Sequence, residues 1–140
     1  MGKNRSSDLA SVADGIGIMA SAACAVHCLV TPALLVVGAS VPLTFTFLTD
    51  DSVHAIFLWA VLPAAVVALG IGYRRHHNTS VLALGAAGVA GLVFAVVAGH
   101  DVLGEGGERL VTLLSAGILI FAHVRNLRGC RNEACAHDTA

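Results

Sequence analysis

The chain has 140 residues, of which 56% are hydrophobic and only 12% charged, and its formal net charge is −1. A soluble domain of this size needs more charge to cover its surface, so the composition favours a single membrane domain over residues 1–140. The sequence contains no basic patch with interleaved aromatic residues, and we therefore expect no nucleic-acid partner.

Four uncharged runs separate the charged residues, with lengths of 35, 22, 25 and 15 residues. A helix needs about 20 apolar residues to span the hydrocarbon, so the first three runs are long enough. The fourth becomes long enough if Arg125 and Arg128 extend their guanidinium groups to the interface. Because lipid offers the backbone no partners, we predict an all-α, four-transmembrane-helix bundle at about 15–38, 53–73, 80–99 and 108–128, with a short tail at 129–140.

The basic residues divide unequally between the two sides of this bundle. Seven of the eight fall on the side of the termini, and only Arg109 falls with the acidic residues on the other side. The positive-inside rule therefore predicts that both termini are cytoplasmic and that two short acidic loops face outward. A cleaved signal peptide is the alternative for the N-terminus, but the stretch before Cys24 lacks a leucine-rich centre.

Small residues and prolines indicate how the helices pack. Gly85, Gly88 and Gly91 recur at helical spacing in the third predicted span, which favours a close helix–helix contact over a ligand site. Pro32 and Pro63 each remove a backbone donor within a span, so each predicts a kink. The first kink would fall just after a cluster of thiols, where a ligand needs space.

That cluster is Cys24, His27 and Cys28, in the first predicted span. On a helix the three fall within an arc of roughly 100°, so their side chains face the same way. Thiolate and imidazole are the donors that soft or borderline metals prefer, and the span has no carboxylate for Mg²⁺ or Ca²⁺. We therefore predict a metal site here; the alternative is that each cysteine is a small buried hydrophobe.

Three stretches resemble the MerC-type family of inner-membrane proteins: CAVHC followed by LVTPALL, HAIFLWAVLPAAVVALGIGYRRH, and AHVRNLRGC. The resemblance covers about residues 15–130. It implies four membrane helices and uptake of a soft metal, mercuric ion in the archetype, with Cys24 and Cys28 matching the cysteine pair of the transport site. The pair is more widely spaced here and encloses a histidine, so Hg²⁺ and Zn²⁺ both stay open as the transported ion. No permanent cofactor is expected.

Further candidate ligands lie outside the cluster. His123, in the fourth span, is predicted either to join Cys24 in a site between helices or to bond a backbone carbonyl. A second group is expected at the outer mouth, as collectors of cations or as an ordinary solvated loop: His54, His100, Asp50, Asp51 and Asp101. His76 and His77 are weaker candidates for exit ligands on the cytoplasmic side.

The tail carries Cys130, Cys135 and His137. Thiols stay reduced in the cytoplasm, so these are predicted to receive metal from the membrane site and pass it to a cytoplasmic thiol-containing acceptor. We expect a multi-pass inner-membrane metal transporter and no enzyme, because no third group orients Cys24 and His27. The sequence has no nucleotide-binding loop, so we expect no ATP coupling within the chain. A membrane redox or metal sensor that does not transport is the alternative, and a structural subunit is a third hypothesis.

Overall fold

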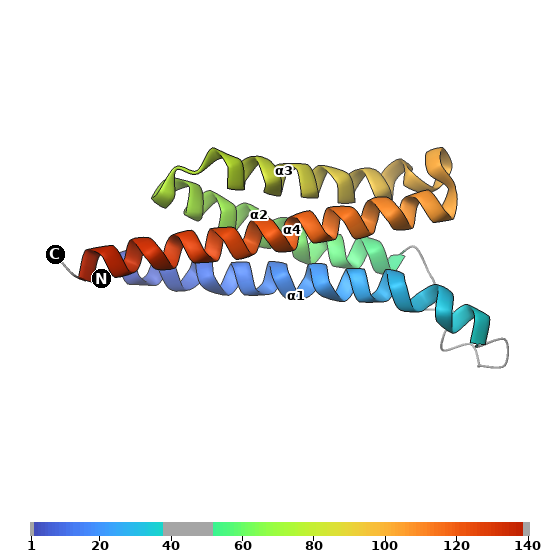
Figure 1. Ribbon diagram of the computed structural model, residues 1–140, viewed down its shortest axis with the longest axis horizontal. Coiled ribbons are helices and arrows are strands. Elements are labelled where there is room, and N and C mark those ends of the chain that lie inside the picture. Colours follow the sequence, from blue (N-terminus) through green and yellow to red (C-terminus); the bar gives the residue numbers. More distant parts are fainter. Residues whose placement is uncertain (1, 38–51, 139–140) are drawn as a thin grey trace.

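The computed structural model describes the backbone of residues 2–37 and 52–138, and the side chains of Arg5 and of residues 8–32 and 56–130. All regular structure in these ranges is helical. α1 (Gly2–Val37) is followed by α2 (Ser52–His76), α3 (Thr79–Phe94), the π-helical segment η2 (Ala95–Gly99) and α4 (His100–Asp138). Successive helices run antiparallel and form an elongated bundle (Figure 1).

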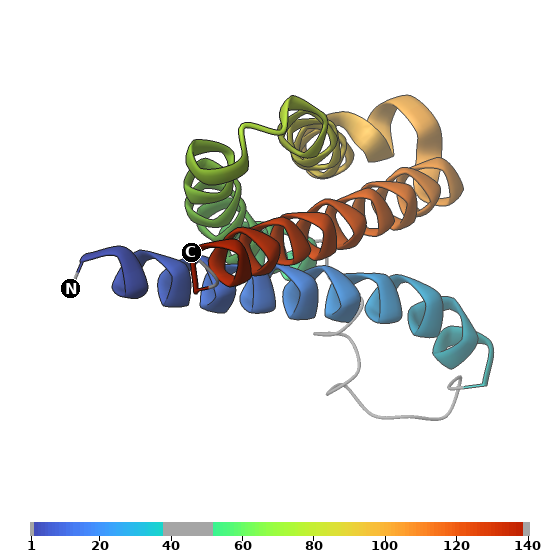
Figure 2. The same cartoon turned by 60° about the vertical axis from the view of Figure 1, so that its left-hand side comes forward.

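The bundle has two distinct ends. The start of α1, the connection between α2 and α3 and the end of α4 lie together at what we call the terminal end (Figure 1). The reversal of the chain near the start of α4 lies at the opposite, turn end. In the α2–α3 connection, Asn78 caps α3 by accepting hydrogen bonds from the backbone N–H groups of Ser80 and Val81 at 3.1 and 3.3 Å. Seen from a second direction, α1 and α3 lie on opposite sides of the pair formed by α2 and α4 (Figure 2).

Three stretches of the described chain are long and apolar enough to cross a membrane: Asp8–Pro32, Ile56–His76 and Thr79–Cys130. The third, of 52 residues, contains Gly104, whose φ of 66° and ψ of 175° turn the chain back on itself. α3 and α4 therefore lie side by side in opposite directions (Figure 1). The expected all-α architecture with membrane-length apolar helices is confirmed for this part of the chain.

The helices extend beyond the spans expected from the uncharged runs. α1 begins at Gly2 instead of near residue 15, and α4 continues to Asp138 instead of ending near residue 128. A helix continues past a charged residue wherever the side chain reaches water or a polar partner, so charge spacing underestimates its length. Pro32 and Pro63 lie inside α1 and α2, and neither proline ends its helix.

The contact predicted at the glycines of α3 is confirmed. A Cβ on Gly85 would collide with the side chain of Leu69 in α2. A Cβ on Gly88 would lie 2.7 Å from Leu119 Cγ and 3.1 Å from the carbonyl oxygen of Ser115, both in α4. Close backbone approach of this kind drives helix association in lipid, where apolar burial alone contributes little.

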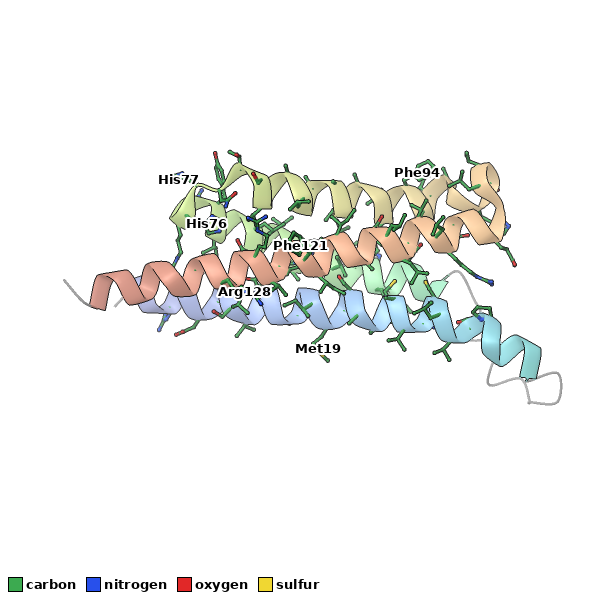
Figure 3. The ribbon with its side chains drawn as sticks, viewed as in Figure 1. Met19, His76, His77, Phe94, Phe121 and Arg128 are labelled. Atoms are coloured by element: carbon green, nitrogen blue, oxygen red, sulfur yellow. The ribbon has the colours of Figure 1, made fainter. Side chains whose placement is uncertain are left out.

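Large apolar side chains cover both the interior and the outer surface of the bundle. Leu119 is fully buried at the centre, where it packs with apolar side chains of α2 and α3. Met19 and Trp59 are 71% and 80% exposed, and Figure 3 shows Met19, Phe94 and Phe121 on the outside of the helices. An apolar exterior over a small-residue interior is the pattern of a bundle that faces lipid.

Candidate metal site

Cys24 and Cys28, the cysteine pair, lie one helical turn apart on the face of α1 that packs into the bundle. Each is 3% exposed, and the two thiols lie within hydrogen-bonding reach of one another. Neither forms a disulfide. Cys24 lines a cavity of about 10 Å³, whose other walls include Leu58, Leu92, Val96 and Thr112, from α2, α3, η2 and α4 respectively. A cavity of this size holds about one water-sized sphere, so the thiol of Cys24 borders a space for a single small ligand.

His27 lies at the edge of this face. It is partly buried, and its ring centroid lies 6.2 Å from that of Phe57 in α2. Its carbonyl oxygen accepts a hydrogen bond from Thr31 Oγ1 at 2.7 Å. Within the described residues, no three side chains of the His, Cys, Asp or Glu type gather closely enough to hold one ion together. Among the residues that line the central cavity, the soft donor is the thiol of Cys24.

His123 lies in the bundle interior beside Asp14 of α1, and not beside Cys24. Its Nδ1 atom lies 2.8 Å from Asp14 Oδ1, and both residues are 0% exposed. A Cβ on Gly17 would collide with the imidazole, so the ring lies directly against the backbone of α1. Gly17 precedes Cys24 by seven residues, which is about 10 Å along a helix. The structure thus separates His123 from the cysteine pair, and its partner is a carboxylate in place of the expected backbone carbonyl.

Asn126 extends this contact toward the terminal end. Its Nδ2 group donates hydrogen bonds to Asp14 Oδ2 at 2.8 Å and to the carbonyl oxygen of Ala68 at 3.0 Å. Its Oδ1 atom lies 3.0 Å from His76 Nε2, and His76 Nδ1 accepts a hydrogen bond from the backbone N–H of Asn78 at 3.1 Å. These contacts join α1, α2 and α4 in what we call the buried polar network: Asp14, His76, Asn126 and His123.

The network opens into a pocket of about 290 Å³ at the terminal end. His76 lines this pocket together with Arg125 and Arg128, and Figure 3 shows His76 and Arg128 toward this end of the bundle. Two guanidinium groups give the pocket positive charge, which suits ligands that carry carboxylates. His77 packs instead against Tyr73, with ring centroids 5.7 Å apart.

At the turn end, His100 and Glu108 form a polar contact. His100 Nδ1 lies 3.4 Å from Glu108 Oε2, and the two side chains are 59% and 11% exposed. Asp101 is exposed beside them. Thr112, which lines the central cavity, follows Glu108 by one turn of α4 and donates a hydrogen bond to its carbonyl oxygen at 2.9 Å. Acidic groups at this end thus lie one turn from the space beside Cys24.

Cys130 is the tail cysteine that the structure describes. It is 3% exposed, it forms no disulfide, and it follows His123 by seven residues, which places both on one face of α4. The remaining candidate ligands have side chains outside the described residues: His54, Cys135, His137, Asp50 and Asp51.

Six buried polar residues of the described chain were not among the expected ligands: Asp14, Ser21, Glu108, Thr112, Ser115 and Asn126. A signal for the first two exists in the sequence. Positions 14, 17, 21, 24 and 28 advance in steps of three and four, so Asp14 and Ser21 share the face of the cysteine pair. Ser21 is 0% exposed, and its hydroxyl has no hydrogen-bond partner in the described part of the chain.

Comparison with known proteins identifies a family for the chain. A family model described as MerC mercury resistance protein matches residues 14–128, a range that begins at Asp14 and includes the cysteine pair and the whole buried polar network. No curated protein and no solved structure matches the chain. MerC proteins are membrane transport proteins that handle mercury, and they are not enzymes. The match covers most of the sequence and confirms the resemblance: the chain belongs to the MerC mercury resistance family.

Proposed function

We propose that this chain is an inner-membrane transporter that moves a soft metal ion, Hg²⁺ in the first place, inward through a bundle of four transmembrane helices. Membership of the MerC family supports the choice of ion. The observation that carries the proposal is the buried cysteine pair, of which Cys24 borders a small cavity where all the described helices meet. Two soft donors one helical turn apart, with space for one small ligand beside the first, suit the capture of a single soft ion.

A topology with four membrane crossings and cytoplasmic termini agrees with the turn at Gly104 and with the distribution of charge between the two ends of the bundle. The terminal end carries the basic residues that end α2 and those of the last part of α4: Arg74, Arg75, Arg125 and Arg128. The turn end carries Asp101 and Glu105. Because basic residues stay on the cytoplasmic side, the ion enters at the turn end and leaves at the terminal end.

Side chains that can attract or bind the metal ion lie at each stage of this path. Glu108, His100 and Asp101 attract cations at the turn end. The cysteine pair then binds the ion as thiolates, so binding releases the thiol protons. Cys130 and Cys135 receive the ion at the cytoplasmic side and pass it to a soluble thiol acceptor.

Replacement of the cysteine pair tests this function. In a Cys24→Ser, Cys28→Ser double variant, Hg²⁺ accumulation by cells should be lost, because a hydroxyl is a hard donor that does not ionise near neutral pH. Hg²⁺ binding by the purified chain should fall to the part that Cys130 and Cys135 hold. Cys130→Ser, which also replaces a buried thiol, should retain binding. Expression must be matched between variants. Undiminished binding and uptake by the double variant would refute the proposal, and binding without uptake by the wild-type chain would favour a sensor.

His27→Ala distinguishes the two candidate ions. Two thiolates are enough for Hg²⁺, so its uptake should survive the loss of the imidazole. Zn²⁺ takes four tetrahedral donors, so its uptake should fall when His27 is lost. Uptake assays with both ions at equal expression give the comparison, and an equal loss for both would contradict a two-thiolate site for Hg²⁺.

A further inference from the structure

We infer that the pocket at the terminal end binds the phosphate group of an acidic phospholipid, and that Arg125 and Arg128 hold this phosphate. The site goes beyond the proposed function, because it concerns the lipid around the bundle and does not depend on which ion is transported. Three observations carry it: a pocket of suitable size, two guanidinium groups without acidic partners in the described chain, and their position at the edge of the apolar surface.

The pocket lies where α4 passes the connection between α2 and α3. Its volume is about 290 Å³, near the lower end of the range of about 300–1,000 Å³ that is usual for small-molecule sites. Three helices contribute to its walls: His76 ends α2, Val81 lies in the first turn of α3, and Gly129 follows the arginines in α4. Figure 3 shows His76 and Arg128 at the same end of the bundle. The space is therefore large enough for a phosphate group and part of the glycerol next to it.

The imidazole of His76 forms a fixed wall of this pocket. Its Nε2 atom lies 3.0 Å from Asn126 Oδ1, and its Nδ1 atom lies 3.1 Å from the backbone nitrogen of Asn78. A Cβ on Gly129 would lie 3.0 Å from His76 Cδ2, so the ring also lies close to the backbone of α4. Both ring nitrogens thus have partners, and the groups that remain for an anion are the two guanidinium groups.

Neither Arg125 nor Arg128 has an acidic partner among the residues whose side chains the structure describes. Arg109 at the turn end is different, since its guanidinium group lies 3.7 Å from a carboxylate oxygen of Glu105. Like charges about one turn apart on a helix repel one another. An anion between the two arginines would remove this repulsion, and a guanidinium group binds phosphate oxygens as well as it binds carboxylates.

The depth of the pocket indicates that a lipid supplies the anion. Phe121 is 52% exposed on the apolar surface of α4, and the guanidinium carbon of Arg125 lies 5.6 Å from the centre of its ring. The membrane-length stretch that contains both residues ends at Cys130. The arginines therefore lie where the apolar surface ends, which is the level of the lipid phosphates. Basic pockets between transmembrane helices at this level bind the headgroups of acidic lipids.

Native mass spectrometry of the purified full chain in a neutral detergent measures the lipid that stays bound. The probes are phosphatidylglycerol, which has a net negative charge, and phosphatidylcholine, whose phosphate is balanced by a quaternary ammonium group. The wild-type chain should retain phosphatidylglycerol in preference to phosphatidylcholine. Retention should decrease as the salt concentration rises, because both arginines are exposed and their charge is screened. Equal retention of the two lipids would overturn the inference.

Replacement of the arginines tests the position of the site. Arg125→Gln and Arg128→Gln should each weaken the binding of phosphatidylglycerol about 5-fold, and the double variant about 30-fold. The matched control is the double variant Arg5→Gln, Arg74→Gln, because both of these arginines are exposed and neither lines the pocket. It loses the same charge and should bind normally. Equal weakening by the two double variants would overturn the site, because it would indicate a general attraction between basic residues and acidic lipid.

A measurement on the wild-type chain avoids dependence on the variants. Phosphatidylglycerol with a photoreactive group in its headgroup should label residues 121–130 or the α2–α3 connection. Labelling confined to other parts of the chain would overturn the site. Unlabelled phosphatidylglycerol should compete with the probe, and inorganic phosphate should not. Equal competition by inorganic phosphate would overturn the lipid as the ligand and assign the pocket to a soluble anion.

The outcomes separate this inference from the proposed function. Capture of Hg²⁺ is measured in the same samples by the ultraviolet absorption of the Hg–thiolate bond. It should be unchanged in the Arg125→Gln, Arg128→Gln double variant, because the cysteine pair lies outside the pocket. A wild-type chain that captures Hg²⁺ but retains no phosphatidylglycerol overturns the lipid site and leaves the proposed function standing. A chain that retains the lipid but shows no Hg–thiolate absorption refutes the proposed function and leaves the lipid site standing.

Discussion

The packing of Gly72 against Asn126 makes the rigidity of the buried polar network measurable. Gly72 is buried in α2, and a Cβ there would collide with the side-chain amide of Asn126. That amide is 0% exposed and is held by hydrogen bonds to His76, Asp14 and the carbonyl oxygen of Ala68. It cannot swing aside without losing some of them. Gly72→Ala should therefore destabilise the bundle.

The expected loss of stability of Gly72→Ala is the sum of two contributions. Insertion of a methyl group into a packed interior costs about 1–3 kcal/mol. Loss of two hydrogen bonds, at the membrane average of about 0.6 kcal/mol each, adds about 1 kcal/mol. Alanine also has a helix propensity about 1 kcal/mol more favourable than that of glycine. Gly70→Ala gains the same amount, and its Cβ meets nothing within 4 Å, so the difference between the two variants is free of this contribution. Gly72→Ala should thus be less stable than Gly70→Ala by about 2–4 kcal/mol.

Unfolding of the full-length chain by SDS in mixed micelles, followed by circular dichroism, gives the free energy of unfolding of both variants. The comparison is between two glycines of one helix, two residues apart, so helix propensity and expression background are matched. Equal free energies for Gly70→Ala and Gly72→Ala would refute the reasoning, because they would mean that Asn126 moves aside at no cost.

Three further predictions concern topology, packing and pH. In a background without the native cysteines, a membrane-impermeant maleimide should label a cysteine at Glu105 from outside the cell and not one at Ser6; the reverse pattern would invert the orientation. Gly88→Ala should lower stability by about 1–3 kcal/mol relative to Gly117→Ala, whose Cβ meets nothing within 4 Å, and equal unfolding curves would contradict the tight α3–α4 contact. Affinity of the cysteine pair for Hg²⁺ should rise with pH because the ion displaces thiol protons, and a pH-independent binding constant would exclude thiolate ligands.

The membrane-length helices were predictable because hydrocarbon excludes unpaired charge, so the charged residues mark where a chain returns to water. The same reasoning is wrong for Asp14, which it places at the edge of the first predicted span. Its carboxylate is 0% exposed inside the bundle, because it is paired with His123, 109 residues away in the sequence. No local pattern reports a partner at that distance.

The burial of the cysteine pair is a consequence of helical spacing alone, since both cysteines fall on the inner stripe of α1. His123 is different. The sequence offered Cys24 or a backbone carbonyl as its neighbour, and the axial register between α1 and α4 decides the matter in favour of Asp14. That register is set by packing between helices, which the spacing within either helix does not contain.

The turn at Gly104 also decides on which side of a membrane the chain ends. As one straight helix, the 52 residues of Thr79–Cys130 would extend about 78 Å, far beyond the hydrocarbon core of about 30 Å. Folded back, they count as two crossings instead of one. An even total returns the C-terminus to the side where the N-terminus began, whereas an odd total separates them. In the proposed four-span topology, this turn therefore gives the even number of crossings.

Two free-energy costs show which feature of the turn maintains the even number of crossings. An L-residue at the φ of 66° and ψ of 175° of Gly104 costs about 1–3 kcal/mol. Straightening the chain instead would draw charged residues into the lipid, at about 2.5–3.5 kcal/mol each near its centre. The turn has four of them: Asp101, Glu105, Glu108 and Arg109. The charges thus outweigh the glycine, so in the proposed topology a substitution at Gly104 should strain the turn but leave both chain ends on the same side.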